Sequence, residues 1–562
     1  MASKSIPSTK IDQSDALEIL RKFQSLQTKR SNYETIWDEI TEYVLPSRGT
    51  YTHQVTSSNI DRKSKKRFDS TAVNAHRTLT ARVVAEMTNS GSRWFDYRDH
   101  DPVIDKLPHV RKFLQTVSDK AYSILNSGSF RMSHIEVTSD WCAYGTACML
   151  TEEDDSNEIV FRSVPVVEVY VSENKSGDVD TVYRRFKLTY RQACQYFGDD
   201  QIPDETHQAC EKDIHQDLEF LHCITPNSDY DETKKRNSFF RFKSQYLLIK
   251  SKTIVSQGYF KRKPYIVLRF WKRSGEAYGG SPAIDSLADI RMINVLKEAY
   301  LRATQLQAFP PIAVANDSVV APLRLIPNGI NYGAMSPDGK LLVGRLFDST
   351  LDLSAVREVM QDTVMSIRSS FFVDPLINRE NSIRTAAEVG KRSDEETVGL
   401  APFLSRYEVE YLSPILDLIL DYLLQTDSSL QVPVELQGRI AKIEYTGPLA
   451  KTQRGQELNN NIQFMQILQT MAQTDPSLLQ HLNSANMLQN FADLFGVSLD
   501  ILNDPQAVAQ MQQQVAEKQQ AQEALNTLGQ GAQIASSSLS DLSKSGLLNR
   551  QDLGLPPSPE GL

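Results

Sequence analysis

The sequence lacks the marks of several large protein classes. Its 562 residues contain only five cysteines, an odd number that favours reduced thiols over a disulfide framework. No apolar run reaches the 18 residues of a membrane span, because the best candidate, residues 415–424, is interrupted by Asp417 and Asp421. The first 15 residues are polar and carry no signal-peptide core. We therefore expect a protein that folds inside a cell and does not contact a membrane.

Common catalytic motifs are missing as well. No GxxxxGK[ST] loop is present to bind phosphates, since Gly339-Lys340 is followed by Leu341. The chain also has no HExxH, GxSxG or CxxC motif. We expect no enzymatic activity and no cofactor.

Two groups of residues resemble metal ligands only superficially. Cys210, His215, His222 and Cys223 fit no common structural zinc spacing. The acidic stretch 152–155 offers oxygen ligands for a divalent cation, but a solvated hairpin turn is the simpler interpretation. We expect no metal site at either place.

Composition is that of a globular chain with a mild acidic excess. Hydrophobic residues make up 40% and charged residues 23%, and the formal net charge is −9. This length suggests three to four domains, and this balance argues against a protein that holds nucleic acid by bulk charge. The basic run 62–67 is either a patch for nucleic acid or an acidic partner, or a solvated loop.

A long helix is the main feature of what is present. Ser281 and Pro282 are a favourable N-cap and first helical residue, and Pro310-Pro311 ends the helix. The span of roughly 25 residues is about twice the usual helix length. One face carries an apolar stripe of Ile284, Leu287, Ala288, Met292, Val295, Leu296, Ala299, Ala303 and Leu306. The pattern is typical of a strut that joins two bodies.

Other periodic segments indicate an α+β fold that is mainly helical. Further helices are expected at about 14–45, 70–87, 107–127, 133–147, 190–197, 352–370, 384–424, 449–473, 484–495 and 505–528. Strands are expected at 159–161, 164–171, 179–187, 239–250 and 265–271. The strands place a β-rich insertion at about 150–272, between helical parts. Gly399, Pro402 and Pro414 are expected to kink the helix that starts near Arg384.

A small β module separates the strut from the next long helix. Residues 309–351 contain short strands and tight turns, too few to hold a core alone. The helix at 352–370 has its own apolar stripe. We therefore predict a hairpin of two struts with a β tip.

Several separate segments together resemble the portal, or head-to-tail connector, proteins of short-tailed bacteriophages. None of these segments is specific by itself, but their order is. They are Arg67–Ala72, Ser92–Phe95, Ala143–Leu150, Leu188–Ala193 with Phe197-Gly198, Tyr278–Pro282, Arg384–Val389 and Gly447–Ala450. The resemblance covers residues 15–500 and leaves the polar tail unmatched.

The resemblance implies a portal fold with named parts. These are a wing at 1–275, a stem helix at 276–308, a clip at 309–351, a second stem helix at 352–370, a tunnel loop at 371–383, a kinked wing helix with a return segment at 384–448, a helical crown at 449–530 and a flexible tail at 531–562.

The resemblance also implies a function without catalysis. Family members form rings, usually of twelve copies, at one capsid vertex, and double-stranded DNA passes through the axial channel during packaging and ejection. The implied partners are the terminase, tail adaptor proteins, the major capsid protein and scaffold or internal core proteins. The expected location is the virion, after assembly in the host cytoplasm. Two alternatives remain: a DNA-processing enzyme, and a helical scaffold or adaptor without a channel.

Candidate site residues follow from these expectations. Asn378, Arg379 and Arg384 are candidates for the DNA channel, although Arg379 equally suits a solvated loop or a salt bridge between subunits. The mixed-charge face of the strut is the candidate for ring contacts. Its residues are Asp285, Asp289, Arg291, Lys297, Glu298 and Arg302.

Overall fold

The computed structural model divides the chain into two units, Met1–Gln453 and Arg454–Leu562. In the second unit it describes only a helical turn at residues 463–467 and residue 518. In the first unit it describes residues 13–46, 67–89, 91, 93–105, 107–126, 128–154, 158–203, 206–207, 215–231, 237–308, 312–314, 338, 340–341, 343–345, 353–373, 399–436 and 441–446.

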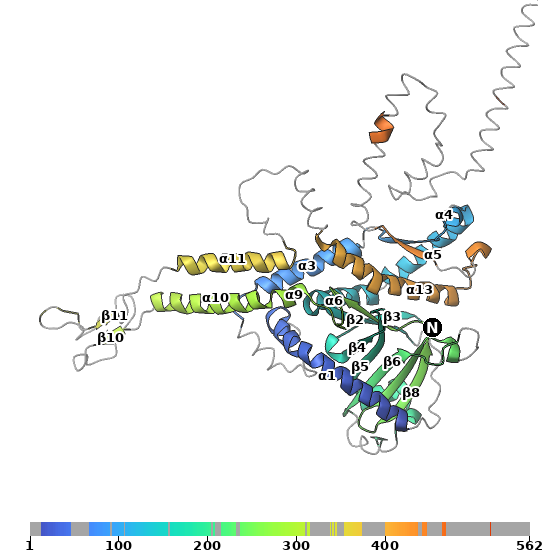
Figure 1. Ribbon diagram of the computed structural model, residues 1–562, viewed down its shortest axis with the longest axis horizontal. Coiled ribbons are helices and arrows are strands. Elements are labelled where there is room, and N and C mark those ends of the chain that lie inside the picture. Colours follow the sequence, from blue (N-terminus) through green and yellow to red (C-terminus); the bar gives the residue numbers. More distant parts are fainter. Residues whose placement is uncertain are drawn as a thin grey trace, which may run out of the picture. The chain divides into compact units, whose positions relative to one another are not determined.

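The first unit mixes helices and sheets, as the α+β expectation requires (Figure 1). Its longer helices are α1 (Gln13–Tyr43), α3 (Thr71–Met87), α5 (Pro108–Asn126), α6 (Gly128–Tyr144), α7 (Tyr190–Phe197), α10 (Leu287–Ala308), α11 (Ser354–Ser370) and α13 (Ser413–Thr426). Short helices are α4 (Pro102–Asp105) and α9 (Pro282–Asp285). The periodic segments at 14–45, 70–87, 107–127 and 190–197 are confirmed as helices.

Two antiparallel sheets occupy the β-rich insertion. A five-stranded sheet has the order β4-β5-β6-β7-β8, and a three-stranded sheet has the order β3-β2-β9. The strands are β2 (Thr146–Glu153), β3 (Ile159–Val164), β4 (Val169–Glu173), β5 (Val179–Thr189), β6 (Asp217–Pro226), β7 (Phe242–Leu248), β8 (Thr253–Phe260) and β9 (Tyr265–Arg269). Elsewhere, β1 (Phe95–Arg98) pairs with β12 (Lys442–Tyr445), and β10 (Ile312–Val314) pairs with β11 (Val343–Arg345).

Five of the described strands were not predicted, namely β1, β2, β6, β8 and β12. β6 is the central strand of the five-stranded sheet, and its residues alternate between the two faces. Leu221 and Cys223 face α1, while Phe220 packs in a separate cluster with α7. His222 and Cys223, weighed above as metal ligands, are therefore two buried strand residues.

α1 joins two hydrophobic cores. Its first half packs Ile19 and Phe23 against the five-stranded sheet, and its second half buries Trp37 and Ile40 in the main core. Between them lies Arg30, whose Nη1 donates to the carbonyl oxygens of residues 166, 167 and 169 at 2.8–3.3 Å. Its guanidinium also lies 3.6 Å from the centre of the Tyr170 ring. With the Glu34 carboxylate, to which Nη2 donates at 2.8 Å, this buried cation is satisfied by an ion pair, backbone acceptors and an aromatic face.

Two helix predictions need correction. α6 begins at Gly128 rather than near 133 and ends at Tyr144, because β2 starts at Thr146. The strut is not one helix: α9 ends at Asp285, and α10 begins at Leu287. Between them lies Ser286, whose hydroxyl donates to the Pro282 carbonyl. The helix expected at 352–370 is confirmed as α11, which begins at Ser354.

The predicted interruption near Pro414 takes the form of a π-helical turn. Residues 399–407 are helical, η6 (Glu408–Leu412) is the π-turn, and α13 continues from it. Ser413 N–H bonds to the Glu408 carbonyl, one residue further back than in an α-helix. In an α-helix the ring of Pro414 would clash with the carbonyl of Glu410, and the extra residue avoids that clash.

Among the described helices, none combines the length and apolar character that a membrane crossing requires.

Candidate functional site: the stem and its root

α10 and α11 lie side by side and form a helical hairpin that ends in the β10–β11 pair (Figure 1). We call α10 and α11 the stem. The inner part of α10 packs inward through Leu287, Ile290 and Ile293, and the inner part of α11 through Thr363 and Ile367. Beyond Asn294, no residue of α10 is buried. The stem therefore has a packed inner half and an exposed outer half.

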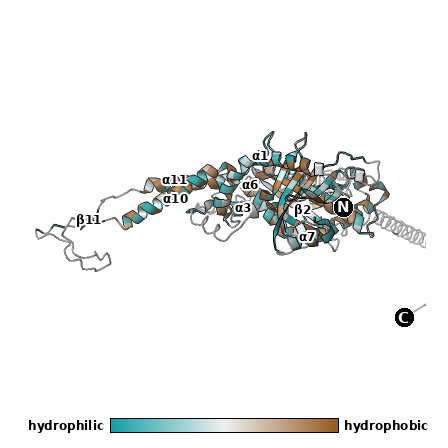
Figure 2. Ribbon diagram, turned by 90° about the horizontal axis from the view of Figure 1, so that it is seen from below, coloured by the Kyte–Doolittle hydropathy of each residue, from teal (hydrophilic) through white to brown (hydrophobic). Residues whose placement is uncertain are grey.

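Of the apolar stripe expected on the strut, Leu287 packs in the core, but five of the nine residues are exposed. Met292 is 43% exposed, Val295 65% and Leu306 55%, and Ala288 and Ala299 are exposed too. At 3.6 residues per turn these five residues fall within a sector of about 60°, on roughly the opposite side of α10 from its buried residues. Figure 2 shows hydrophobic residues recurring along both stem helices. α10 is thus apolar on two sides, and α11 covers only one.

The charged residues expected to make ring contacts have partners within the chain. Arg291 donates from Nε to Glu39 of α1 at 2.7 Å, and Lys297 donates to Asp69 at 2.9 Å. Asp289 accepts a hydrogen bond from Ser366 of α11 at 2.7 Å.

Of the three remaining charged residues, two lie on α10 and one lies on α9. Glu298 and Arg302 pair one turn apart along α10, and Asp285 lies at the end of α9. Burial raises the pKa of Asp285, and Arg273 partly offsets this. Five of the six charges are therefore engaged within one chain, and a role in ring contacts stays a prediction. Asn378, Arg379 and Arg384 lie outside the described residues.

Asp69 and Lys297 connect α10 to the start of α3. Burial alone would raise the pKa of the Asp69 carboxyl, but hydrogen bonds from Lys297 and Thr71 outweigh it and lower the pKa. The Asn294 side chain accepts from the backbone N–H groups of Phe68 and Asp69 at 3.0 and 3.1 Å. These contacts fix the middle of α10 to the body of the unit.

We define the root of the stem as residues 278–281 together with the turn 143–146. Three glycines allow these two segments to approach each other closely. Gly145 has a φ of +74°, a conformation that favours glycine. A Cβ at Gly145 would lie 2.4 Å from the Gly280 carbonyl oxygen, and one at Gly280 would lie 2.1 Å from Trp271 Nε1. At Gly279 a Cβ would lie 2.3 Å from the Gly145 carbonyl oxygen. The two backbones approach so closely that no side chain fits between them.

Hydrogen bonds complete the root. The Ser281 hydroxyl donates to the Ala143 carbonyl at 2.6 Å and accepts from Ile284 N–H at 3.1 Å, so the predicted cap is confirmed and also joins two segments. Gly279 N–H donates to the Thr146 hydroxyl at 2.8 Å. The Tyr278 hydroxyl accepts from Val171 N–H at 3.2 Å. The root is therefore bonded to α6, β2 and β4.

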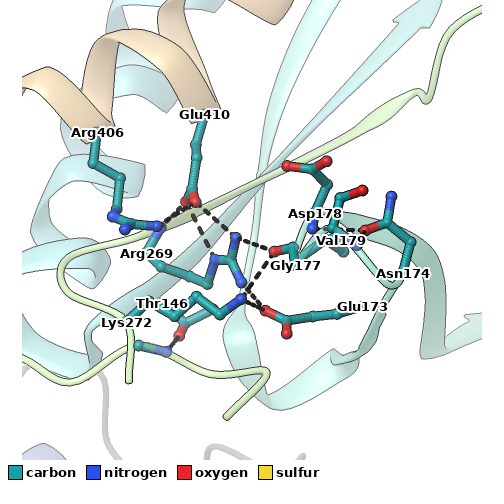
Figure 3. Close-up of polar contacts among 12 residues, drawn as sticks. Thr146, Glu173, Asn174, Gly177, Asp178, Val179, Arg269, Lys272, Arg406 and Glu410 are labelled. Carbon is teal, nitrogen blue, oxygen red and sulfur yellow. Dashed lines mark hydrogen bonds and ion pairs between the residues drawn. The ribbon is translucent and has the colours of Figure 1, made fainter. Parts of the chain in front are cut away.

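A buried ionic cluster lies beside the root. Arg269 of β9 lies between Glu410 of the π-turn and Glu173 at the end of β4 (Figure 3). Its backbone N–H, Nε and Nη2 donate to the Glu410 carboxylate at 3.0, 3.3 and 2.7 Å. Arg406 donates to the same carboxylate at 2.8 Å, and Lys272 pairs with Glu173 at 2.7 Å. Such charge-assisted, bidentate bonds are the strong kind, and they fix the geometry of the π-turn.

A comparison of the whole chain with known families gives one extensive match. Residues 16–502 match the family described as bacteriophage head to tail connecting protein. The chain belongs to this family. Among curated relatives, the probable portal protein of Bordetella phage BPP-1 is 26% identical to this connector. The portal protein of Salmonella phage epsilon15 is 25% identical. Each alignment covers 93% of this chain and 95% of the relative, so the resemblance inferred from the sequence is confirmed.

Two segments that carried the resemblance meet in this connector. Ala143–Leu150 supplies Gly145 and Thr146, and Tyr278–Pro282 supplies the two glycines and the capping serine. Spacing along the sequence gave no sign that they touch, because about 130 residues separate them. The signal that was available is the glycine content, since glycine is the residue that a close backbone approach requires.

Within the described residues of the connector, no three His, Cys, Asp or Glu residues are grouped as metal ligands. His222 bonds to the hydroxyls of Tyr265 and Ser244 at 2.7 and 2.9 Å. Burial lowers the pKa of its imidazole well below the ordinary value. His222 is thus a hydrogen-bonded core residue, and Cys210 lies outside the described residues.

Proposed function

We propose that this connector acts as a phage portal: copies close into a ring at one capsid vertex, and double-stranded DNA passes through the ring during packaging and ejection. The number of copies that the family resemblance implies is twelve. The ring would dock the terminase first and the tail adaptor proteins later, and it would contact the major capsid protein and scaffold or internal core proteins. The virion vertex is the proposed location, with assembly in the host cytoplasm.

The exposed apolar stripe of α10 is the observation that supports a ring best. Single exposed hydrophobic residues are common, but a continuous stripe opposite a buried face marks a contact surface. A closed ring repeats one heterologous contact, in which each copy offers two different faces. A two-helix stem with a second apolar side meets that requirement, since one side packs within the chain and the other is left for a neighbour.

Charge supports passage of DNA rather than tight binding. Each copy carries a formal charge of −9, so a ring of copies repels the phosphate backbone overall. Every phosphate contact adds to a salt-sensitive affinity, and a duplex that must slide cannot be held by many of them. We assign a centring role to a few cations, with Arg379, Arg384 and the neighbouring Asn378 as candidates. Replacing Arg379 by Ala would lower packaged or retained DNA, and unchanged packaging and retention would remove Arg379 from the channel.

Electron microscopy of the purified full-length chain tests the ring directly. Rings with a central hole are expected, whereas monomers or filaments would contradict the proposal and favour a scaffold or adaptor. Val295→Glu places a charge in the stripe and is expected to abolish rings. Gln305→Glu adds the same charge to the same helix outside the stripe and is expected to leave rings intact.

A further inference from the structure

The end of α11 meets the helical segment 399–407 through an aromatic contact. The ring of Phe372, which lies just after the end of α11, is 5.6 Å from the ring of Phe403. Phe403 also stacks on Phe270 at 4.9 Å, and it lies 5.8 Å from the ring of Trp271. Phe403 thus joins the end of α11 to the residues that follow β9.

This contact brings together the two described ends of one segment. Residues 374–398 lie outside the described residues, and they contain Arg379 and Arg384, two of the candidates for the DNA channel. Phe372 lies just before this segment, and Phe403 lies about one helical turn after it. The chain therefore leaves the described part of the first unit and rejoins it at neighbouring points.

Phe372 has a backbone conformation that glycine usually occupies. Its φ is +55°, and Val373 N–H bonds to the Arg368 carbonyl at 2.9 Å, as in a Schellman cap with Phe372 at the left-handed position. Phe372 N–H bonds to the Ser369 carbonyl at 3.0 Å, which is the second bond of that cap. Glycine would make the same two bonds with less strain. The cap therefore does not explain a phenylalanine at this position, whereas the contact with Phe403 does.

The segment 399–407 gives this contact a rigid support. Leu400 is fully buried in the main core. The hydroxyl of Tyr407 bonds to the hydroxyl of Thr138 on α6 at 2.7 Å, and both groups are buried. Phe403 lies between these two fixed positions of the helix. Its ring is therefore a fixed point against which the end of α11 is oriented.

We propose that Phe372 and Phe403 form a positioning pair for the DNA channel. The pair sets the direction in which the chain leaves α11, and it holds that exit beside the point where the chain returns. Arg379 and Arg384 are thereby presented from a rigid base, as functional loop residues usually are. The inference rests on the proposed function, because it takes these two arginines to contact DNA. It also accounts for the backbone strain at Phe372, since such strain persists where the surroundings fix it.

Phe372→Gly separates positioning from stability. Glycine keeps the cap and relieves the strain, so we expect an equal or higher thermal midpoint and intact rings. The variant also loses the contact with Phe403, so we expect packaged or retained DNA to fall several-fold. Phe372→Tyr keeps the ring and should behave as wild type.

Lys252→Gly is the matched control for the relief of strain. Lys252 lies in the turn between β7 and β8, and it is the other described non-glycine residue with a positive φ, at +53°. Its replacement should raise or preserve the thermal midpoint in the same way. Packaged and retained DNA should stay at the wild-type level, because this turn carries no part of the positioning pair.

A double-mutant cycle tests whether the pair acts through the two arginines. Arg379→Ala/Arg384→Ala should lower packaged or retained DNA. Adding Phe372→Gly to it should cause little further loss, because both changes remove the same contact with DNA. Losses that multiply would show that Phe372 acts independently of the arginines and would overturn the inference. A normal DNA content in the Phe372→Gly variant, or a lower thermal midpoint, would overturn it as well.

The same variants distinguish this inference from the proposed function. If the arginine variant is defective and Phe372→Gly is normal, only the positioning pair is wrong. If the arginine variant packages and retains DNA normally, the assignment of Arg379 and Arg384 to the channel is wrong, and the positioning pair is wrong with it. A wild-type chain that forms no rings contradicts the proposed function as a whole.

Discussion

The inner and outer halves of the stem share two helices but differ in what holds them. The inner half is fixed by glycine contacts, a capping serine and buried Ile290, Ile293 and Ile367, all within one chain. The outer half of α10 buries nothing, yet it presents apolar residues to solvent. The inner half is therefore stabilised by contacts within the single chain, whereas the outer half of α10 carries apolar surface that the described part of the chain leaves exposed. Substitutions in the two halves should accordingly change different measurements.

The largest effect is expected at the root. Gly145→Ala puts a Cβ within 2.4 Å of a carbonyl oxygen at a φ of +74°, so the root must separate or the turn must distort. We expect a cost of about 3 kcal/mol or more, seen as a fall of several degrees in the thermal midpoint. Gly128→Ala is the control, because a Cβ there meets nothing within 4 Å. Equal midpoints for the two variants would show that the close approach does not hold the stem.

The next largest effect is expected when a buried and an exposed residue of α10 are each replaced by alanine. Ile293 is 1% exposed and Val295 65%. Ile293→Ala is expected to cost about 3 kcal/mol of unfolding free energy, because it leaves a cavity. Val295→Ala is expected to change it by less than about 0.5 kcal/mol. Chemical denaturation of unassembled chains measures both. A similar loss at both positions would contradict the division of the stem into two halves.

A smaller effect is expected for the pair that fixes the middle of α10. Lys297→Met leaves the buried Asp69 carboxyl without its cation and should cost about 1–2 kcal/mol at pH 7. The folded pKa of Asp69 is lowered, so its stabilising contribution is present above the unfolded pKa and is lost as the pH falls. Denaturation at pH 7 and pH 3 should therefore show a difference between wild type and variant that shrinks at pH 3. A constant difference would mean that Lys297 acts through packing.

The smallest effect concerns Glu408 of the π-turn. Burial raises the pKa of its carboxyl to about 7 from an ordinary value of 4.5. The folded state then binds more protons than the unfolded state between these values, so this group lowers stability as the pH rises from 4.5 to 7. Glu408→Gln should be more stable than wild type at pH 8, by about 1 kcal/mol after allowance for partial exposure, and equal to it near pH 4. Glu358→Gln on the exposed face of α11 should show no such pH dependence.

The periodicity of apolar residues predicted much of the secondary structure, but it did not predict which elements pack against one another. Helices such as α5 and α11 were found because their apolar residues recur every three to four positions, and Ser281-Pro282 announced the start of α9. The apolar stripe of α10 was found too, but the sequence did not show that most of its residues are exposed within the single chain. A period shows that a helix has an apolar side, and it does not show which surface covers that side.

Contacts between distant residues were beyond sequence reasoning. Arg291 bonds to Glu39, and Lys297 bonds to Asp69, although more than 200 residues separate the partners in each pair. The sequence therefore could not show that these side chains, predicted as ring contacts, are engaged within the chain. β6 was missed because His222 and Cys223 suggested chemistry where the strand only alternates between two packed faces. Pro414 predicted an interruption, but not that it takes the form of a π-turn whose Glu410 bonds to Arg269, 141 residues away.

Arg30 has a consequence for the order in which the chain becomes structured during translation. Its acceptors lie about 136–139 residues downstream, and β8, which α1 also touches, is more than 200 residues downstream. At typical synthesis rates of about 5–20 residues per second, α1 leaves the ribosome on the order of ten seconds or more before its sheet exists. An amphipathic helix with Phe23 and Trp37 uncovered is then available to chaperones throughout that interval. α1 is therefore synthesised well before the sheet on which it docks.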